Sequence, residues 1–163
     1  MGAVSGDGAR RHQSAELGRR TSLRLGQLDL ANWMGELVDA NADVPLHRVR
    51  IPGTHDSGAY KLSRYRMGDF PAWLRGISTM SYGIATRPIT GIMAGWGEAQ
   101  ALDIYGQCAQ GARYLDLRVV HERGSFFTTH GMAGACFEDL LTQVACFLDE
   151  HPTEVGPVQV ETG

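Results

Sequence analysis

The segment from Arg113 to Val120 constrains the fold more than any other part of the chain, because its side chains alternate with a strict two-residue period. One face of the predicted strand is apolar and consists of Leu115, Leu117 and Val119. The other face is polar and consists of Tyr114, Asp116 and Arg118. An acid and an arginine on one face need either each other, as a structural ion pair inside a barrel, or a polar ligand. This segment alone leaves both interpretations open.

Strand and helix patterns alternate along the chain, which indicates an α/β architecture. Strand-like segments are predicted over 46–51, 113–120, 125–130 and 154–160. Helical spacing of apolar residues predicts helices over 30–38, 98–110 and 137–151. Four strand candidates make about half of an eight-stranded barrel, and a complete barrel usually needs ~250 residues. The sequence therefore predicts a partial TIM-barrel-like fold.

Composition narrows the class of protein. Residues 1–26 are rich in Gly, Arg and Ser and predict a disordered leader before a domain over 27–163. No apolar run approaches the ~20 residues that span a bilayer. The net charge is −3, and the three cysteines form no CxxC pair. We expect a cytoplasmic protein with reduced thiols, no metal site, no cofactor, no transmembrane segment and no nucleic-acid partner.

A hairpin is expected after the alternating strand, because too few residues separate Val120 from Phe126 for a crossover helix. A three-residue turn over 122–124, with the glycine last, would set the pairing of the two strands. That register places Ser125 opposite His121, Thr128 opposite Arg118 and His130 opposite Asp116. Asp116, Arg118 and His130 would then share one face, whereas a slip of one residue would turn His130 to the other side.

A second histidine, His55, lies in a Gly- and Pro-framed loop just past a predicted strand end, within the sequence Ile-Pro-Gly-Thr-His-Asp-Ser-Gly. A lone loop histidine commonly has no special role. Two histidines can divide the removal and the donation of a proton near neutral pH. An arginine between them is suited to bidentate pairing with a phosphodiester. His55, His130 and Arg118 together are typical of phosphoryl transfer.

Several motifs in order resemble one family. The stretch 50–58 is similar to the first-strand signature of the X-domain of phosphatidylinositol-specific phospholipase C. Trp96 and Gln100, the stretch 107–118, and Thr129-His130-Gly131 follow with matching spacing, then the helix 137–151 and Pro152-Thr153-Glu154-Val155. The resemblance covers about Leu46 to Val155, roughly two thirds of the chain. It implies the first half of a phospholipase C-like barrel.

The resemblance also implies residue roles. His55 would be the general base that activates the inositol 2-hydroxyl, and His130, assisted by Asp56, would protonate the departing diacylglycerol oxygen. Arg118 would stabilise the transition-state charge, with Asp116 orienting it. Arg118 stands where calcium-dependent relatives have a carboxylate, which implies a calcium-independent phosphodiesterase. Its substrate would be phosphatidylinositol or a related phospholipid, which it would reach by associating peripherally with a membrane. Its first product would be inositol 1,2-cyclic phosphate.

The tail departs from the family, since Gly156-Pro157 interrupts the expected apolar strand and the chain then ends at Gly163. We expect a truncated barrel, with residues 1–163 alone showing little phosphatidylinositol cleavage. The stretch 59–97 carries apolar residues without a clear period, which favour a lid or packing segment over a membrane-touching rim: Phe70, Trp73, Ile77, Met80 and Tyr82.

Two alternatives to a phosphatidylinositol-cleaving enzyme remain at this point. One is a non-catalytic phosphoinositide-binding or regulatory remnant of the same fold. The other is a glycerophosphodiester phosphodiesterase, which shares a barrel but begins with a His-Arg-Gly motif that this chain lacks.

Overall fold

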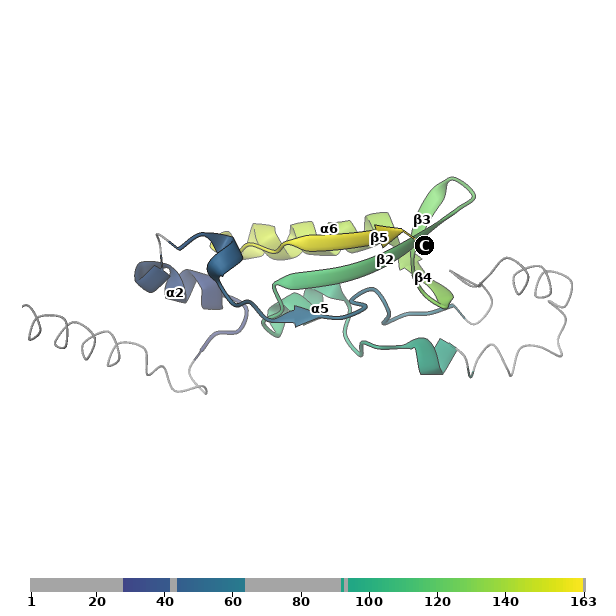
Figure 1. Ribbon diagram of the computed structural model, residues 1–163, viewed down its shortest axis with the longest axis horizontal. Helices are drawn as coiled ribbons and strands as arrows, with labels where there is room; N and C mark the ends of the chain where they lie inside the picture. The colour runs from purple at the N-terminus through teal and green to yellow at the C-terminus, as the bar shows by residue number, and fades with distance from the viewer. Residues whose placement is uncertain (1–27, 42–43, 64–91, 93, 163) are drawn as a thin grey trace, which may run out of the picture.

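One sheet organises the part of the chain that the computed structural model describes, which is residues 28–41, 44–63, 92 and 94–162. The sheet has five strands: β1 (Gly53–Thr54), β2 (Tyr114–Glu122), β3 (Ser125–His130), β4 (Met132–Cys136) and β5 (Val158–Thr162). The helical elements are α2 (Trp33–Asn41), the 3-10 helix η1 (Leu46–Arg48), α5 (Ile104–Ala109) and α6 (Phe137–Glu150). Figure 1 shows α6 running along one face of the sheet, behind β2 and β5.

The central strand β2 pairs along both of its edges. β5 runs parallel to it on one edge, from the Leu115–Val158 pair to the Val119–Thr162 pair. β1 pairs parallel with the start of β2, and β3 pairs antiparallel with its end. Parallel strands joined through helices match the predicted α/β class, and the arrangement is that of part of a TIM-like barrel.

The apolar face of β2 forms the core, as its alternation predicts. Leu115 and Leu117 are buried against α5 and α6, where they join the side chains of Ile104, Cys108, Leu140 and Phe147. Burial raises the pKa of the Cys108 thiol, because the thiolate would lose its hydration there. The other face of β2 is left for the polar side chains of the candidate site.

The first strand lies at a different position from the one predicted. Residues 46–51 begin with η1 and continue without a ladder partner among the described residues, and Leu46 is exposed. The strand forms one step later, at β1, because the carbonyl of Pro52 accepts the backbone N–H groups of Arg113 and Tyr114. The start of β2, far away in the sequence, therefore decides where the first strand lies.

The helix predicted over 98–110 is shorter than expected. Asp103 caps α5 by accepting a hydrogen bond from the Gly106 amide, and the helix stops before Gly111, whose φ is +101°. The residues before α5 are not helical, since the amides of Ala99 and Gln100 both donate to the carbonyl of Ala59. These contacts tie the segment before α5 to the loop that follows β1.

The hairpin forms where it was predicted, but its register is wrong by one residue. Arg123 and Gly124 both have positive φ, +52° and +85°, which makes a two-residue turn of the type I′ kind instead of a three-residue one. Glu122 therefore opposes Ser125, and His121 opposes Phe126. Val119, not Arg118, lies opposite Thr128, and the β2–β3 ladder ends at that pair, so the expected Asp116–His130 pair does not form.

A buried ion pair holds the N-terminal end of β2. The Arg113 guanidinium and the Glu154 carboxylate approach to 2.7 Å, and both side chains are almost fully buried. Glu154 also accepts from the amides of Met34 and Gly35 at the start of α2, and Arg113 donates to carbonyls that include those of Cys108 and Ala31. The pair thus joins α2, α5, β2 and the segment after α6.

Two predictions fall on residues outside the described part. These are the leader over 1–26 and the lid or packing segment, whose five apolar residues Phe70, Trp73, Ile77, Met80 and Tyr82 all lie between 64 and 91.

Candidate active site

The loop after β1 presents two predicted site residues in a tight turn. Asp56 has a left-handed backbone, with φ of +47°, a conformation that Asp and Asn tolerate better than most residues. The Gln100 side chain donates to the carbonyl of His55 over 2.8 Å, and the Ala59 amide donates to the carbonyl of Asp56 over 2.8 Å. The backbone of the turn is therefore held from both sides, with the His55 side chain 71% exposed and the Asp56 side chain 2% exposed.

Asp56 is the common neighbour of three cationic or potentially cationic side chains. Its carboxylate oxygens lie 3.0 Å from His55 Nε2, 3.4 Å from His130 Nε2 and 2.9 Å from Arg118 Nε. A buried carboxylate is stable as an anion only if it is paired. The three partners provide that pairing and come from three different segments of the chain.

The contact between Arg118 and Asp56 is close but poorly aligned. Although Nε and Oδ1 are 2.9 Å apart, neither atom has a hydrogen-bond partner among the described residues, because the N–H does not point at the oxygen. The pair is thus an electrostatic contact that leaves hydrogen-bonding capacity unused on both side chains. Arg118 remains about one third exposed, toward the open side of the site.

Asp116 contacts His55, not Arg118. His55 Nδ1 and Asp116 Oδ2 are 2.7 Å apart, and the Asp56 amide also points at this oxygen over 3.4 Å. The expectation that Asp116 orients Arg118 is therefore not met by the geometry. A neutral imidazole has one N–H to donate, so both His55 contacts are satisfied only when the ring is doubly protonated or when one of the two carboxyl groups carries a proton.

His130 reaches the site through an irregularity in β3. Thr128 and Thr129 are both buried, and the β3–β4 register shifts between Phe127 and Thr129, so the alternation of side chains breaks there. The break compensates for the shifted hairpin register, and the ring lies beside Asp56. His130 Nδ1 is 2.7 Å from the carbonyl of Gly97, which only accepts, so this nitrogen carries a proton.

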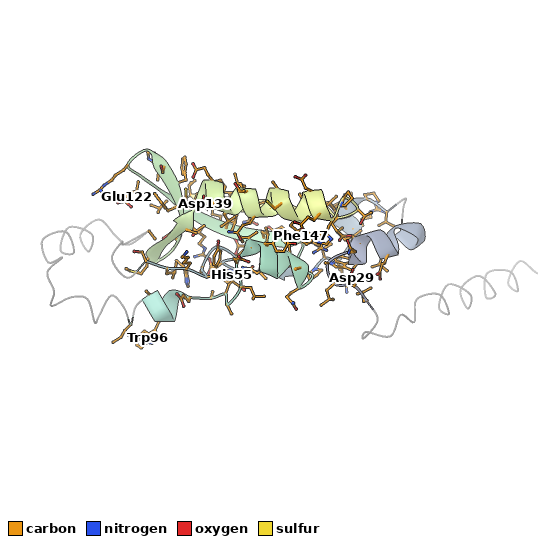
Figure 2. All side chains as sticks on the ribbon, turned by 180° about the vertical axis from the view of Figure 1, so that it is seen from behind. Asp29, His55, Trp96, Glu122, Asp139 and Phe147 are labelled. Atoms are coloured by element: carbon orange, nitrogen blue, oxygen red, sulfur yellow. The ribbon has the colours of Figure 1, made fainter. Side chains whose placement is uncertain are left out.

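The structure thus brings together all five residues singled out in the sequence: His55, Asp56, Asp116, Arg118 and His130. Three of them line an open pocket of about 450 Å³ on the polar face of the sheet, namely His55, Asp116 and Arg118. His130 is not among the lining residues of that pocket and joins the group through Asp56. Figure 2 shows His55 on the side of the molecule away from α6.

Sequence reasoning missed two residues of this pocket. Gln159 and Glu161 alternate with valines in β5, and parallel pairing places them beside Asp116 and Arg118. Tyr114, at the start of β2, donates its hydroxyl to the Gln159 side chain, which in turn donates to Glu161 over 2.9 Å. The alternation of valines with polar residues over 158–161 could have indicated that Gln159 and Glu161 share a face, but the preceding Gly156-Pro157 interrupts the strand pattern.

His55, Asp56 and Asp116 are also able to hold a metal ion. Each offers one ligand atom, and these atoms lie within 4.8 Å of one another. The nearby guanidinium of Arg118 competes with such an ion for Asp56, because two positive charges would share one buried carboxylate.

Known proteins are similar to this chain in sequence. The chain is 37% identical over 133 residues to mouse PI-PLC X domain-containing protein 1, a match that covers 78% of this chain and 38% of that protein. It is 35% identical over 130 residues to the human protein of the same name, covering 76% and 39% respectively. This chain belongs to the PI-PLC X-domain family. It spans about two fifths of the length of these X-domain relatives.

Solved structures show the same fold. Crystal structures of the phosphatidylinositol-specific phospholipase C of Staphylococcus aureus superpose with a TM-score of 0.57, 22% identity in one case and 19% in another, covering 82% of the X-domain chain and 36% of theirs. No family model matches the chain. Among the described residues, none of the helices has the length and apolar character that crossing a bilayer demands.

Proposed function

We propose that this chain carries the phosphoryl-transfer site of an enzyme that cleaves phosphatidylinositol to diacylglycerol and inositol 1,2-cyclic phosphate. The observation that carries the proposal is the buried Asp56 carboxylate, which two imidazoles and one guanidinium surround within 3.4 Å. The X-domain relatives and the phospholipase C fold support the same reaction class.

In the proposed reaction, His55 removes the proton of the inositol 2-hydroxyl, and the resulting oxygen attacks the neighbouring phosphorus in line. Arg118 pairs with the phosphate oxygens as charge builds on them. His130 donates a proton to the diacylglycerol oxygen as its bond to phosphorus breaks. One imidazole gains a proton and the other loses one, so the charge beside Asp56 stays constant through the reaction.

The exposed side chains of Ile92 and Trp96, which we call the rim, support a lipid surface as the partner. Trp96 is 86% exposed and Ile92 is 56% exposed. Figure 2 shows Trp96 at the edge of the molecule, away from α6. The carbonyl of Gly97, next in the chain, accepts from His130. Exposed aromatic side chains favour the interface of a bilayer, so we infer peripheral membrane association at this rim.

The test is release of inositol cyclic phosphate from phosphatidylinositol vesicles. It is run on the 163-residue chain and on this chain joined to the unmatched remainder of mouse PI-PLC X domain-containing protein 1, because the chain spans part of its relatives. His55→Ala and His130→Ala should each reduce turnover by about 10²- to 10⁴-fold. His121→Ala is the control, since that exposed histidine lies in the hairpin, where its ring contacts the Phe126 ring at a tilted angle.

Turnover that survives both site variants would overturn the proposal. Vesicle binding that Arg118→Gln abolishes, with no turnover by either form of the chain, would instead favour a non-catalytic phosphoinositide-binding protein.

A further inference from the structure

Gln107 is a buried polar side chain on the core side of α5, and the proposed chemistry gives it no role. It is 4% exposed and lies between the buried apolar residues Ile104 and Cys108. Its amide nitrogen donates to the carbonyls of Ser57 and Leu102, over 2.9 and 2.8 Å. Its amide oxygen lies 2.6 Å from the hydroxyl of Thr54, the last residue of β1.

These contacts determine which way the amide points. The carbonyls of Ser57 and Leu102 only accept, so both require the NH₂ group of Gln107. The amide oxygen must then face Thr54, and the Thr54 hydroxyl must be the donor. A hydroxyl has one proton, so Thr54 has none left for its other neighbour, the Ser57 hydroxyl.

The direction of hydrogen bonding continues through Ser57, which is fully buried. Its hydroxyl lies 2.7 Å from the Thr54 carbonyl and 2.8 Å from the Thr54 hydroxyl oxygen, and its single proton must go to one of them. The hydroxyl oxygen is then free to accept the Asp116 amide over 3.0 Å. The Ser57 amide donates to the Asp116 carbonyl over 2.7 Å, so Ser57 holds the Asp116 backbone from both sides.

We propose that Gln107 is a positioning residue that holds the His55–Asp116 pair through a one-way chain of hydrogen bonds. The chain runs from the Asp116 amide to the Ser57 hydroxyl, from there to the carbonyl or the hydroxyl of Thr54, and from the Thr54 hydroxyl to the Gln107 oxygen. The Asp116 carboxylate in turn contacts His55 Nδ1 at 2.7 Å. The catalytic consequence rests on the proposed function, whereas the positioning of the His55 ring does not.

The best variants for the test change one end of this chain without changing shape. Thr54→Val removes the donor at nearly constant volume, and Thr54→Ser keeps it. Gln107→Leu removes the amide. The matched control is Gln143→Leu on α6, because Gln143 also accepts from a backbone amide, that of Tyr105, and donates to a side chain, that of Tyr60, away from the site.

The first readout is the ¹H and ¹⁵N chemical shifts of the His55 ring in the 163-residue chain without substrate. Thr54→Val and Gln107→Leu should shift and broaden these resonances, whereas Thr54→Ser and Gln143→Leu should leave them at their wild-type positions. The second readout is kcat and KM in the active form. Thr54→Val should lower kcat by up to about 100-fold with KM little changed, because a small displacement of a catalytic group affects the chemical step most.

Thr54→Val and Gln107→Leu variants that lower the Tm but leave the His55 resonances unchanged would overturn the proposal, since Gln107 would then be structural only. Shifts in all four variants, Gln143→Leu included, would overturn it as well. If the His55 resonances move as expected but no form of the protein cleaves phosphatidylinositol, the positioning holds and the proposed function fails.

Discussion

Asp56 concentrates the local chemistry of this protein in one side chain. It is buried, has a left-handed backbone, and contacts both histidines and the arginine of the site. In the proposed reaction the positive charge of an imidazolium passes from one ring to the other. Asp56 contacts both rings, so its carboxylate stabilises the imidazolium on whichever ring carries it.

Asp56→Asn tests this function of the carboxylate. Asparagine tolerates the same left-handed backbone and has the same shape, so the turn should keep its conformation. Loss of the charge should reduce phosphatidylinositol cleavage by at least about 100-fold, because neither imidazolium would be stabilised. The measurement is kcat in the vesicle assay, with circular dichroism to verify folding. Asp29→Asn, which alters an exposed carboxylate that accepts from Ala31 and Asn32, should leave kcat unchanged.

Arg118 leads to a prediction about metal. Its guanidinium supplies positive charge beside Asp56, where a divalent ion would otherwise do so. Cleavage should therefore persist in excess EGTA and EDTA, and Arg118→Lys should lower it, because an ammonium cannot pair with a phosphate bidentately. Activity that disappears with chelator and returns with calcium would contradict this, and would point to His55, Asp56 and Asp116 as ligands.

At the scale of elements, the β2–β3 hairpin determines where His130 lies. Its two-residue turn shifts the register by one, and the irregularity at Thr128 shifts the side chains back toward Asp56. Thr128 is held between two glycines, since an added Cβ at Gly58 or at Gly134 would approach its side chain to 2.5 Å. The loop of His55 and the strand of His130 are thus packed directly on each other.

The turn allows a test of how much a left-handed backbone contributes to the free energy of unfolding. Gly124 has φ of +85° and open space where a Cβ would be, so Gly124→Ala should destabilise through its backbone alone, by about 1 kcal/mol. Arg123→Asn should stabilise by up to about 1 kcal/mol, since Asn-Gly is preferred in this turn. Both are measured by urea unfolding. Gly95→Ala also meets open space but carries no positive φ, so it should not destabilise.

At the scale of the whole molecule, the Arg113–Glu154 pair is the main polar link between distant segments. Arg113 lies over the rings of Trp33 and Phe147, 5.6 and 4.9 Å from their centroids, and Figure 2 shows Phe147 between α6 and the rest of the molecule. Burial raises the pKa of Glu154, but hydrogen bonds from the Gly35 amide, Arg113, the Met34 amide and Thr153 outweigh it and lower the pKa below its ordinary value of 4.5.

This pKa predicts acid sensitivity. Because the folded state holds the Glu154 proton less tightly than the unfolded chain, the stabilisation is complete above about pH 4.5 and is lost as the pH falls toward the lowered value. Glu154→Gln should flatten that part of the pH profile and cost about 3–5 kcal/mol at neutral pH, since it leaves Arg113 buried and unpaired.

The free energy of unfolding, measured across this pH range, checks both effects. The exposed pair of Arg123 and Glu122, with 3.9 Å between its atoms, is the control, and Arg123→Gln should cost less than about 1 kcal/mol. An unchanged acid profile in Glu154→Gln would assign the sensitivity to other carboxyls, such as Asp29, whose hydrogen bonds from Asn32 and Ala31 also lower its pKa.

Local sequence patterns were sufficient to predict several elements of the fold. The alternation over 113–120 predicted β2 and its apolar face, 125–130 predicted β3 with its bounds, and helical spacing predicted α6. The family motifs contain all five site residues. These features follow from side-chain period and from turn residues, which act within a few positions of the chain.

Other features depend on residues that are distant in the sequence, and they follow from the packing of the folded chain. The position of β1 depended on the amides of Arg113 and Tyr114. The late start of α5 depended on the loop of His55, because that loop binds the residues before the helix. The hairpin register depended on whether Arg123 accepts a left-handed backbone, a difference of about 1–2 kcal/mol that no periodicity reports. The pairing of Asp116 with His55, and of Asp56 with Arg118, was decided the same way, because electrostatic contacts form between whichever groups the packed backbone brings within reach.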